Sequence, residues 1–352
     1  MDVLGFLEDL INIPSISGEE EKIAKRVKSE FKSLGYDSVM EVEGNVCGRI
    51  GSGEKILLYD AHMDVVEPGQ GWKEDPFKAR KENNFIIGRG TSDNKSSLAS
   101  MIYGGIKAKT RGLSLYVLAS VCEEVHKGNG LIKFLKSTGI KPDWVVIGEP
   151  SSLNVAIGNK GRICLKIDVK GRSAHASRPN QGENAIYKAA SVIEKIKTLN
   201  QELKEDSVSV TKIETPNKNI NIIPDSCSIY CDYRSNIGRE KKEILNKFMN
   251  IIGEKDKIKF VTKYYKPWSI SEKHSLVNAA LECQKKTSGK EKIIMWNFCT
   301  NGSYTAGELG LPTVGYGPGE ESECHSPEEK VNITSVKTAE KYYSMLPEFI
   351  KN

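Results

Sequence analysis

The sequence predicts an α/β fold with a mainly parallel sheet, interrupted by a smaller inserted α+β domain of ferredoxin-like pattern. Continuous apolar runs alternate with helical patterns in residues 1–160 and again after residue 267. Strands that are apolar throughout are typical of a parallel sheet covered on both faces. Between these regions the segments become shorter and alternate in polarity, and their order is strand, helix, strand, strand, helix, strand.

The first region contains three continuous apolar runs. They are KILLYDAHMD (55–64), LSLYVLASVCEE (113–124) and DWVVIGEP (143–150), with helical patterns between them at 97–108 and 131–137. A long helix nearer the N-terminus is expected after Ser17, because Ser17 followed by Glu20 and Glu21 looks like a capping box before apolar residues at helical spacing.

The inserted region, residues 161–267, has six shorter segments. They are ICLKIDVKG (163–171), NAIYKAASVIEKIKTL (184–199), SVSVTKIE (207–214), SCSIYCDYR (226–234), a Lys-rich helix at 240–253 and IKFVTKYY (258–265). In residues 268–352 the α/β pattern of the first region resumes, with a helix at 275–287, then IIMWNF (293–298) and LPTVGYGPG (311–319). We therefore expect domain boundaries near residues 160 and 267.

Composition narrows the class of protein. The net charge of +5 comes from 51 basic and 46 acidic residues that are mixed along the 352-residue chain, which argues against a nucleic-acid partner. The N-terminus lacks a basic leader, and no apolar run reaches membrane-spanning length, so neither a signal peptide nor a membrane segment is expected. The eight cysteines are scattered without CxxC spacing, which is typical of reduced, cytoplasmic proteins.

Histidines and carboxylates stand where the expected parallel strands end. In an open α/β sheet, ligands gather beyond the carboxyl ends of the strands. Two of the polar residues come instead from a helix start and from a glycine-rich loop. The residues are His62, Asp64, Asp93, Glu123, Glu124, Glu149 and His325.

Two histidines and several carboxylates without a thiolate suit Zn²⁺, Mn²⁺ or Co²⁺ acting as a Lewis acid. Two metals ~3.5–4 Å apart would use this many ligands and hold both a carbonyl oxygen and the attacking water. Each residue alone has a plainer interpretation, because Glu123 and Glu124 could form a solvated loop and Asp93 could cap a helix. Their joint placement at strand ends favours the metal site.

Five motifs resemble, in order, the metal-site motifs of the dinuclear zinc deacylase and peptidase family. This family includes acetylornithine deacetylase, succinyl-diaminopimelate desuccinylase, aminoacylase and glutamate carboxypeptidase. The motifs are His62-Met63-Asp64, Gly88-Arg89-Gly90 through Asp93, Glu123-Glu124, Glu149-Pro150 and His325. The likeness covers nearly the whole chain, and WNFCTNGS followed by GYGPG is most similar to the hydrolases linked to selenium metabolism.

The resemblance implies a zinc-peptidase-like catalytic domain, formed by residues 1–160 and 268–352, with residues 161–267 as a lid and dimerisation domain. It also implies a ligand set for two divalent ions per chain, zinc first and cobalt or manganese as alternatives. His62 and Glu149 would bind one ion, Glu124 and His325 the other, and Asp93 would bridge them.

Further roles follow from the same resemblance. Glu123 would be the general base, and Asp64 would orient His62 by contacting its imidazole. His175, in the lid motif GRSAHASRPNQGENAI, would reach into an active site, in dimeric relatives that of the partner subunit, and stabilise the oxyanion. The peptide bond after Asp93 is expected to be cis.

Substrate contacts are predicted from Asn221, Asn301 and Gly317. Asn221 matches the lid pattern Asn-x-x-Pro, although the glycine often found before it is absent. Asn301 lies in WNFCTNGS, and the backbone amides of the GYGPG loop around Gly317 would suit a substrate carboxylate. His126 and His274 lack motif support and are expected to be surface or structural histidines. His126 is near enough in sequence to Glu124 that a role in supporting the ligands is an alternative.

The sequence therefore predicts a metallohydrolase that cleaves an amide bond in an N-acyl amino acid or short peptide. Metal-bound hydroxide would be the nucleophile, and Glu123 would take its proton and pass it to the leaving amine. Two alternatives stay open: a broad dipeptidase or carboxypeptidase, and a non-catalytic binding protein on the same fold. A homodimer formed through the inserted domain is expected.

Overall fold

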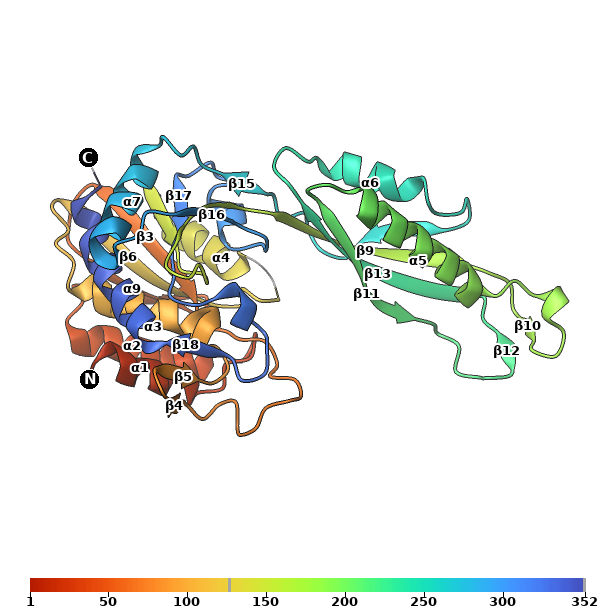
Figure 1. Cartoon of the computed structure of the whole chain (residues 1–352), viewed down its shortest axis with the longest axis horizontal. Helices are drawn as coiled ribbons and strands as arrows, with labels where there is room; N and C mark the ends of the chain where they lie inside the picture. The colour runs from red at the N-terminus through yellow and green to blue at the C-terminus, as the bar shows by residue number, and fades with distance from the viewer. Residues whose placement is uncertain (126–127, 351–352) are drawn as a thin grey trace. The chain divides into compact units, whose positions relative to one another are not determined.

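The computed structural model describes residues 1–125 and 128–350, and its chain divides into two compact units. The main unit comprises Met1–Asn159, Trp268–Trp296 and Thr300–Asn352, and the inserted unit comprises Lys160–Pro267 with Asn297–Cys299 (Figure 1). Within the described part of the chain, no helix is both long and apolar enough to cross a membrane.

One mixed sheet forms the centre of the main unit. Its strands are β1 (Ser38–Val42), β2 (Asn45–Ile50), β3 (Lys55–His62), β6 (Leu113–Ser120), β7 (Trp144–Ile147), β8 (Val155–Asn159), β15 (Trp268–Ser269), β16 (Ile293–Trp296) and β17 (Thr313–Gly315). They are ordered β1-β2-β6-β3-β7-β17-β8-β15, and β16 also pairs with β8. The central neighbours β6, β3, β7 and β17 are parallel, which confirms the predicted fold class.

The central strands are apolar because both faces of the sheet are covered. Along β3, Leu57 and Tyr59 enter the larger core, whereas Asp60 and His62 point to the other face. The helices on the larger core are α1 (Val3–Ile11), α2 (Glu21–Leu34), α3 (Ser96–Ile106), α7 (Ser275–Ser288) and α9 (Ile333–Met345). Helix α4 (Asn129–Thr138) packs beside β1 and β2 with its buried Phe134 outside that core.

A second, three-stranded sheet of the main unit joins two distant segments. It is formed by β4 (Arg80–Glu82), β5 (Phe85–Ile87) and β18 (Lys330–Asn332), in the order β18-β5-β4. Ile87 pairs with Lys330 in antiparallel register, and the N–H of Gly88 donates to the carbonyl of Glu329 at 2.9 Å. The segment that leads to Asp93 therefore lies beside the segment that follows His325.

The inserted unit has the predicted ferredoxin-like order of elements. These are β9 (Gly161–Lys170), α5 (Ala185–Glu202), β11 (Ser207–Glu214), β13 (Ser226–Ser235), α6 (Lys241–Met249) and β14 (Lys257–Phe260). The antiparallel sheet is ordered β11-β13-β9-β14, and both helices share one apolar core on the same face (Figure 1). Short strands β10 (Ala174–His175) and β12 (Ile222–Ile223) pair separately.

The capping box predicted at the start of the first long helix is wrong. Helix α2 begins at Glu21, and the side chain of its N-cap residue, Glu20, makes no capping hydrogen bond. The Ser17 hydroxyl instead donates to Asp64 at 2.6 Å, and Glu20 accepts from the N–H of Cys122 at 2.9 Å. Contacts with distant segments thus use both side chains that the local pattern assigned to the helix end.

Candidate metal site

The carboxyl ends of three parallel strands bring most of the predicted ligands together. His62 is the last residue of β3, Glu123 and Glu124 follow β6, and Glu149 follows β7 by two residues. Strand β3 lies between β6 and β7 in parallel register, so these ends meet at one edge of the sheet.

Asp93 and His325 arrive from the two segments joined by the smaller sheet. Asp93 lies in a kinked turn, Thr91–Lys95, between β5 and α3, where its φ and ψ of −127° and 92° break the helical path. The peptide bond between Asp93 and Asn94 is cis, as expected.

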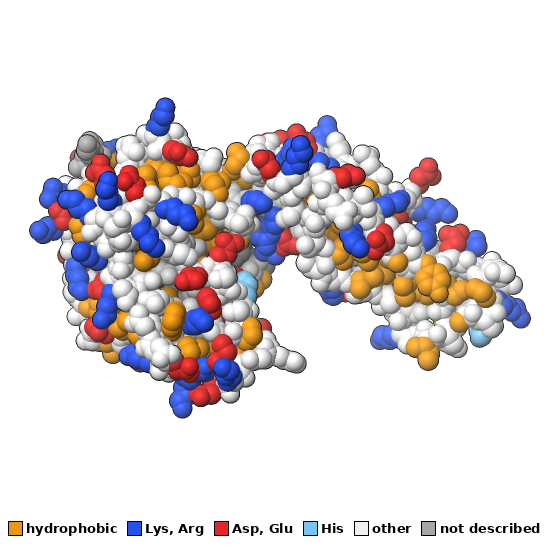
Figure 2. Space-filling view, in the orientation of Figure 1, with side chains coloured by type: hydrophobic (Ala, Val, Ile, Leu, Met, Phe, Trp, Pro, Cys, Tyr) orange, Lys and Arg blue, Asp and Glu red, His pale blue; other side chains and the backbone are white. Residues whose placement is uncertain are grey.

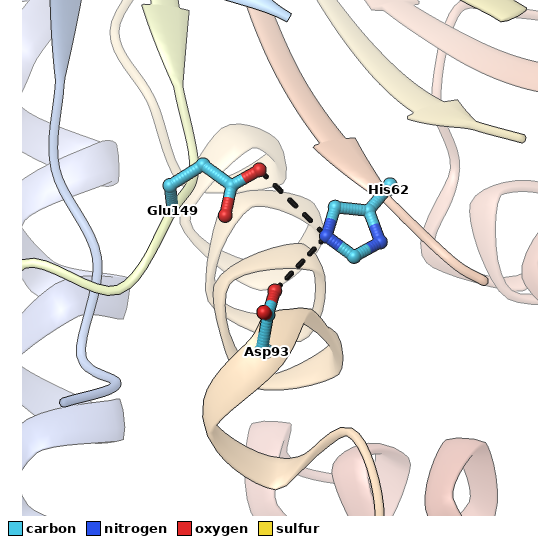
Figure 3. Close-up of side chains that lie close together, drawn as sticks. All are labelled: His62, Asp93 and Glu149. Atoms are coloured by element: carbon cyan, nitrogen blue, oxygen red, sulfur yellow. Dashed lines mark hydrogen bonds and ion pairs between the residues drawn. The ribbon is translucent and has the colours of Figure 1, made fainter. Parts of the chain in front are cut away.

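The predicted ligands form two groups that share Asp93. In each group the candidate ligand atoms lie within 4.8 Å of one another. In the first, Nε2 of His62 lies 3.0 Å from Oδ1 of Asp93 and 3.7 Å from Oε1 of Glu149 (Figure 3). In the second, Nε2 of His325 lies 2.9 Å from Oε1 of Glu124 and 3.4 Å from Oδ2 of Asp93.

The chemistry of these donor atoms fits a pair of divalent ions. Each group offers one imidazole nitrogen and two carboxylates, and Asp93 presents a different oxygen to each histidine, as a bridging ligand must. Nδ1 of His62 lies 2.9 Å from the carbonyl oxygen of Asp64, a contact that directs Nε2 toward the first group. Nitrogen and oxygen ligands without thiolate suit Zn²⁺, Mn²⁺ or Co²⁺ in a catalytic site.

Without metal, the histidines and carboxylates form ion pairs. Hydrogen bonds with Asp93 and Glu124 raise the pKa of His325 to about 10. Burial opposes the charged form of His62, but contacts with Asp64 and Asp93 outweigh burial and raise its pKa well above the usual range. Burial likewise opposes ionisation of Asp93, yet its two imidazole partners hold its pKa well below the usual range.

Metal binding should therefore displace protons at neutral pH. A raised pKa favours the imidazolium form of each histidine, in which both ring nitrogens carry a proton, and one of these protons must leave before a nitrogen can bind a metal. The apparent metal affinity should rise with pH, by up to about tenfold per unit for each proton displaced. Calorimetric titrations in buffers of different ionisation enthalpy would count these protons.

The control is the variant His274→Asn, at a helix cap away from the ligands, which should release the same number of protons on binding metal. A metal affinity that stayed constant from pH 6 to 9 would contradict the assignment of the ligands.

Asp64 contacts more than the imidazole for which it was predicted. One of its oxygens lies 3.5 Å from Nδ1 of His62 and accepts the N–H of Glu123 at 3.0 Å. The other accepts the N–H of Glu124 at 3.1 Å and the hydroxyl of Ser17. Burial opposes ionisation of Asp64, but His62 outweighs it and lowers the pKa to about 2. Asp64 therefore fixes the backbone of both glutamates, a role that its motif does not indicate.

A turn in the left-handed region explains how adjacent glutamates can share one site. Strand β6 ends at Ser120, and Cys122 has a φ of 53°, so the strand's alternation of side chains stops before Glu123. Glu124 belongs to the second ligand group, whereas Glu123 is 1% exposed and belongs to neither group. The structure thus separates the two carboxylates that the sequence sets side by side.

Asn301 and Gly317 have hydrogen-bonding partners inside the main unit. The Asn301 amide donates to Asp60 at 2.7 Å and accepts the N–H of Gly128 at 2.7 Å. The N–H of Gly317 donates to the hydroxyl of Ser151 at 2.9 Å. These contacts give both residues a packing role that their motifs do not indicate, and their contact with substrate stays a prediction.

His175 and Asn221 belong to the inserted unit. His175 is exposed, and its Nδ1 lies 2.7 Å from the hydroxyl of Ser177. It pairs with Ile222, and the carbonyl of Asn221 accepts the N–H of Ala176 at 2.9 Å. The two residues are thus neighbours, and their roles toward substrate stay predictions. His126 lies outside the described residues.

The site has two groups of nitrogen and oxygen ligands that share one carboxylate, and it lies at the carboxyl edge of the parallel strands. This arrangement is typical of a metal-dependent hydrolase. The sequence model for peptidase family M20/M25/M40 matches residues 58–348. The chain belongs to this family, which confirms the predicted resemblance at the level of the family. The likeness to the hydrolases linked to selenium metabolism stays a prediction.

The chain is similar to individual proteins over most of its length. The uncharacterized protein YgeY of Escherichia coli (strain K12) is 32% identical, with 98% of this chain and 94% of the relative covered. An acetylornithine deacetylase of Vibrio campbellii is 31% identical, with 92% of this chain and 91% of the relative covered. A tripeptidase structure from Staphylococcus aureus shares the fold with a TM-score of 0.80 at 22% identity, covering 99% of this chain and 97% of its own.

Proposed function

We propose that the protein hydrolyses the amide bond of an N-acyl amino acid or a short peptide, with Glu123 as the general base. The observation that carries this proposal is the separation of the adjacent glutamates. Glu124 joins a ligand group, whereas Glu123 is buried on the same turn outside both groups. A carboxylate held beside metal ligands, but not used as one, suits proton transfer.

The ligand residues named above would hold two divalent ions, with zinc first and cobalt or manganese as alternatives. When bound, such ions polarise a substrate carbonyl and lower the pKa of water. Glu123 would take a proton from the attacking water and deliver it to the leaving amine. Asp64 would keep Glu123 in place by accepting the backbone N–H of Glu123. His175, in the inserted unit acting as a lid, would donate a hydrogen bond to the developing oxyanion.

An activity screen on the metal-reconstituted protein tests this function. The panel includes N-acetyl amino acids, among them N-acetylornithine because of the acetylornithine deacetylases among the relatives, together with dipeptides and tripeptides. Acyl release without peptide cleavage would identify a deacylase, and the reverse would identify the alternative dipeptidase or carboxypeptidase. A chelator should abolish turnover, and two ions per chain should restore it. A protein that bound no metal and cleaved nothing with added zinc, cobalt or manganese would instead be a binding protein on this fold.

We further propose that two copies associate through the inserted unit. Apolar side chains gather on its surface (Figure 2), where Ile186 is 40%, Tyr187 74% and Ile220 102% exposed. These three residues line a cavity of about 670 Å³. An exposed apolar surface of this kind is typical of an interface, and a second copy of the chain is the partner that we propose.

The variant Tyr187→Lys should convert the dimer to a monomer, because it places a charge in the apolar surface. Light scattering at working concentration measures the change. The control Lys197→Glu, on the same helix but outside this surface, should remain dimeric. If His175 acts across the dimer, Tyr187→Lys should also lower kcat, and wild-type protein that was always monomeric would rule out that role.

The location that we propose is the cytoplasm. All eight cysteines are free thiols. This observation supports a reducing compartment.

A further inference from the structure

Three consecutive backbone amides in the turn after β6 donate to buried carboxylates. The N–H groups of Glu123 and Glu124 donate to Asp64, as described above. The N–H of Cys122, one residue before them, donates to Oε1 of Glu20 at 2.9 Å. Cys122 is the residue with a φ of 53°, a conformation that side-chain-bearing residues rarely adopt. Glu20 therefore anchors the turn where its backbone conformation is least favourable.

Glu20 is itself held in place by its own segment. It is 7% exposed, and its second oxygen accepts the N–H of Gly18 at 2.9 Å. The same segment is fastened to the loop after β3, because the N–H of Ser17 donates to the carbonyl of Val65 at 3.3 Å and its hydroxyl donates to Asp64. Segment 17–20 thus connects the loop after His62 to the turn that carries both glutamates.

A role in capping helix α2 does not account for the Glu20 carboxylate. Glu20 occupies the N-cap position, but its side chain makes no capping hydrogen bond. One of its oxygens faces the distant Cys122 amide, and the other faces Gly18 in the preceding loop. A buried carboxylate is costly unless it accepts hydrogen bonds. The two bonds that Glu20 accepts join the turn at Cys122 to the loop at Gly18, and neither comes from the first turn of α2.

We propose that Glu20 is a positioning residue for Glu123. By holding Cys122 in its left-handed conformation, Glu20 fixes where the Glu123 carboxylate lies relative to the ligand groups. Glu20 belongs to neither ligand group, and Glu124, the ligand on the same turn, is held by Asp64 through its own N–H. We therefore expect loss of Glu20 to slow proton transfer with the metal ions still bound. This inference rests on the proposed function of Glu123.

The variant Glu20→Ala tests the inference, with Glu19→Ala as its control. Glu19 is the neighbouring residue, is exposed, and should tolerate the same change. Glu20→Ala should lower kcat by about 10- to 100-fold with KM and metal content unchanged, because small misplacements of a reacting group cost this much. If the alanine variant fails to fold, Glu20→Gln, which keeps one accepting oxygen, should show a smaller loss of the same kind. Unchanged kcat, or a loss of metal that accounts for the loss of activity, would overturn the inference.

A rescue experiment separates positioning from a general structural role. Glycine adopts positive φ without the cost that other residues carry, so Cys122→Gly in the Glu20→Ala background should recover part of the lost kcat. Lack of recovery would mean that Glu20 does not act through this turn and would overturn the inference. Glu123→Gln is measured in parallel on the same N-acetyl amino acid or peptide. If Glu123→Gln stays active, the proposed function fails, whatever the Glu20 variants show.

Discussion

Replacing Glu123 with Gln is expected to lower kcat by about 10²–10⁴-fold and to leave both metal ions bound, because general base catalysis contributes this much. Glutamine has the same shape but cannot take a proton from water. Metal content should persist because Glu123 belongs to neither ligand group. Its backbone N–H would still donate to Asp64, so the turn should keep its place. Steady-state kinetics and elemental analysis of the same preparation measure the two quantities.

The neighbouring substitution Glu124→Gln is the matched control. The chemical change is the same one residue later, yet the second ligand group loses a carboxylate that lies 2.9 Å from His325. We therefore expect Glu124→Gln to lose activity together with metal, and partial recovery at high metal concentration. If Glu123→Gln lost metal, or if it kept most of the wild-type kcat, the division of roles between the two glutamates would be wrong.

The ligand groups could be predicted because their positions follow from strand ends. His62 and Glu149 stand at the ends of apolar runs that were expected to form parallel strands. Parallel strands bring their carboxyl ends together at the same edge of the sheet. Residue type then restricts the chemistry to a nitrogen and oxygen metal site. Asp93 and His325 lie outside these runs, at a helix start and after a glycine-rich loop. The pattern placed them among the candidate residues, and the likeness to known motifs gave them their ligand roles, but neither indicated that the smaller sheet joins their segments.

The supporting contacts could not be predicted because most of them end on backbone amides. A backbone N–H donor is present at every residue except proline, so the sequence does not indicate which of these donors meet Asp64 or Glu20. The spacing of Ser17 and Glu20 is also that of a capping box. A local pattern cannot show that the two side chains bond to distant segments and not to the start of their own helix. Asn301 could not be interpreted fully for the same reason. Its motif suggests contact with substrate, but the sequence does not indicate that its side-chain amide donates to Asp60 of strand β3.

The outer strands were missed for a different reason. Strand β1 has five residues and is only partly buried, strand β2 has six residues and is mostly buried, and β2 contains Gly48. This glycine is required by packing, because a Cβ at its position would lie 2.4 Å from the ring of Phe31. Glycine lowers the strand propensity of the sequence, yet here it allows helix α2 to approach the sheet.

Glu329 is the second residue whose replacement should have a large effect. It is fully buried, and its carboxylate accepts hydrogen bonds from the N–H groups of Gly90, Ser92 and Asp93. It also pairs with the buried guanidinium of Arg89 at 2.7 Å. Burial raises the pKa of Glu329, and the amide donors and Arg89 oppose this shift. Glu329 thus stabilises the turn that presents the shared ligand, from a position close to His325 in the sequence.

Glu329→Gln should destabilise the fold by about 3–5 kcal/mol, because it leaves the buried charge of Arg89 without its partner. It should also weaken metal binding, since the glutamine amide would face the N–H groups that hold Asp93 in place. Denaturant unfolding with and without metal measures both effects. The control Glu328→Gln removes a partly solvent-exposed pair with Arg80, and it should cost much less stability than Glu329→Gln. If the two variants were equally stable and bound metal equally well, burial of the Arg89–Glu329 pair would not be what holds the shared ligand.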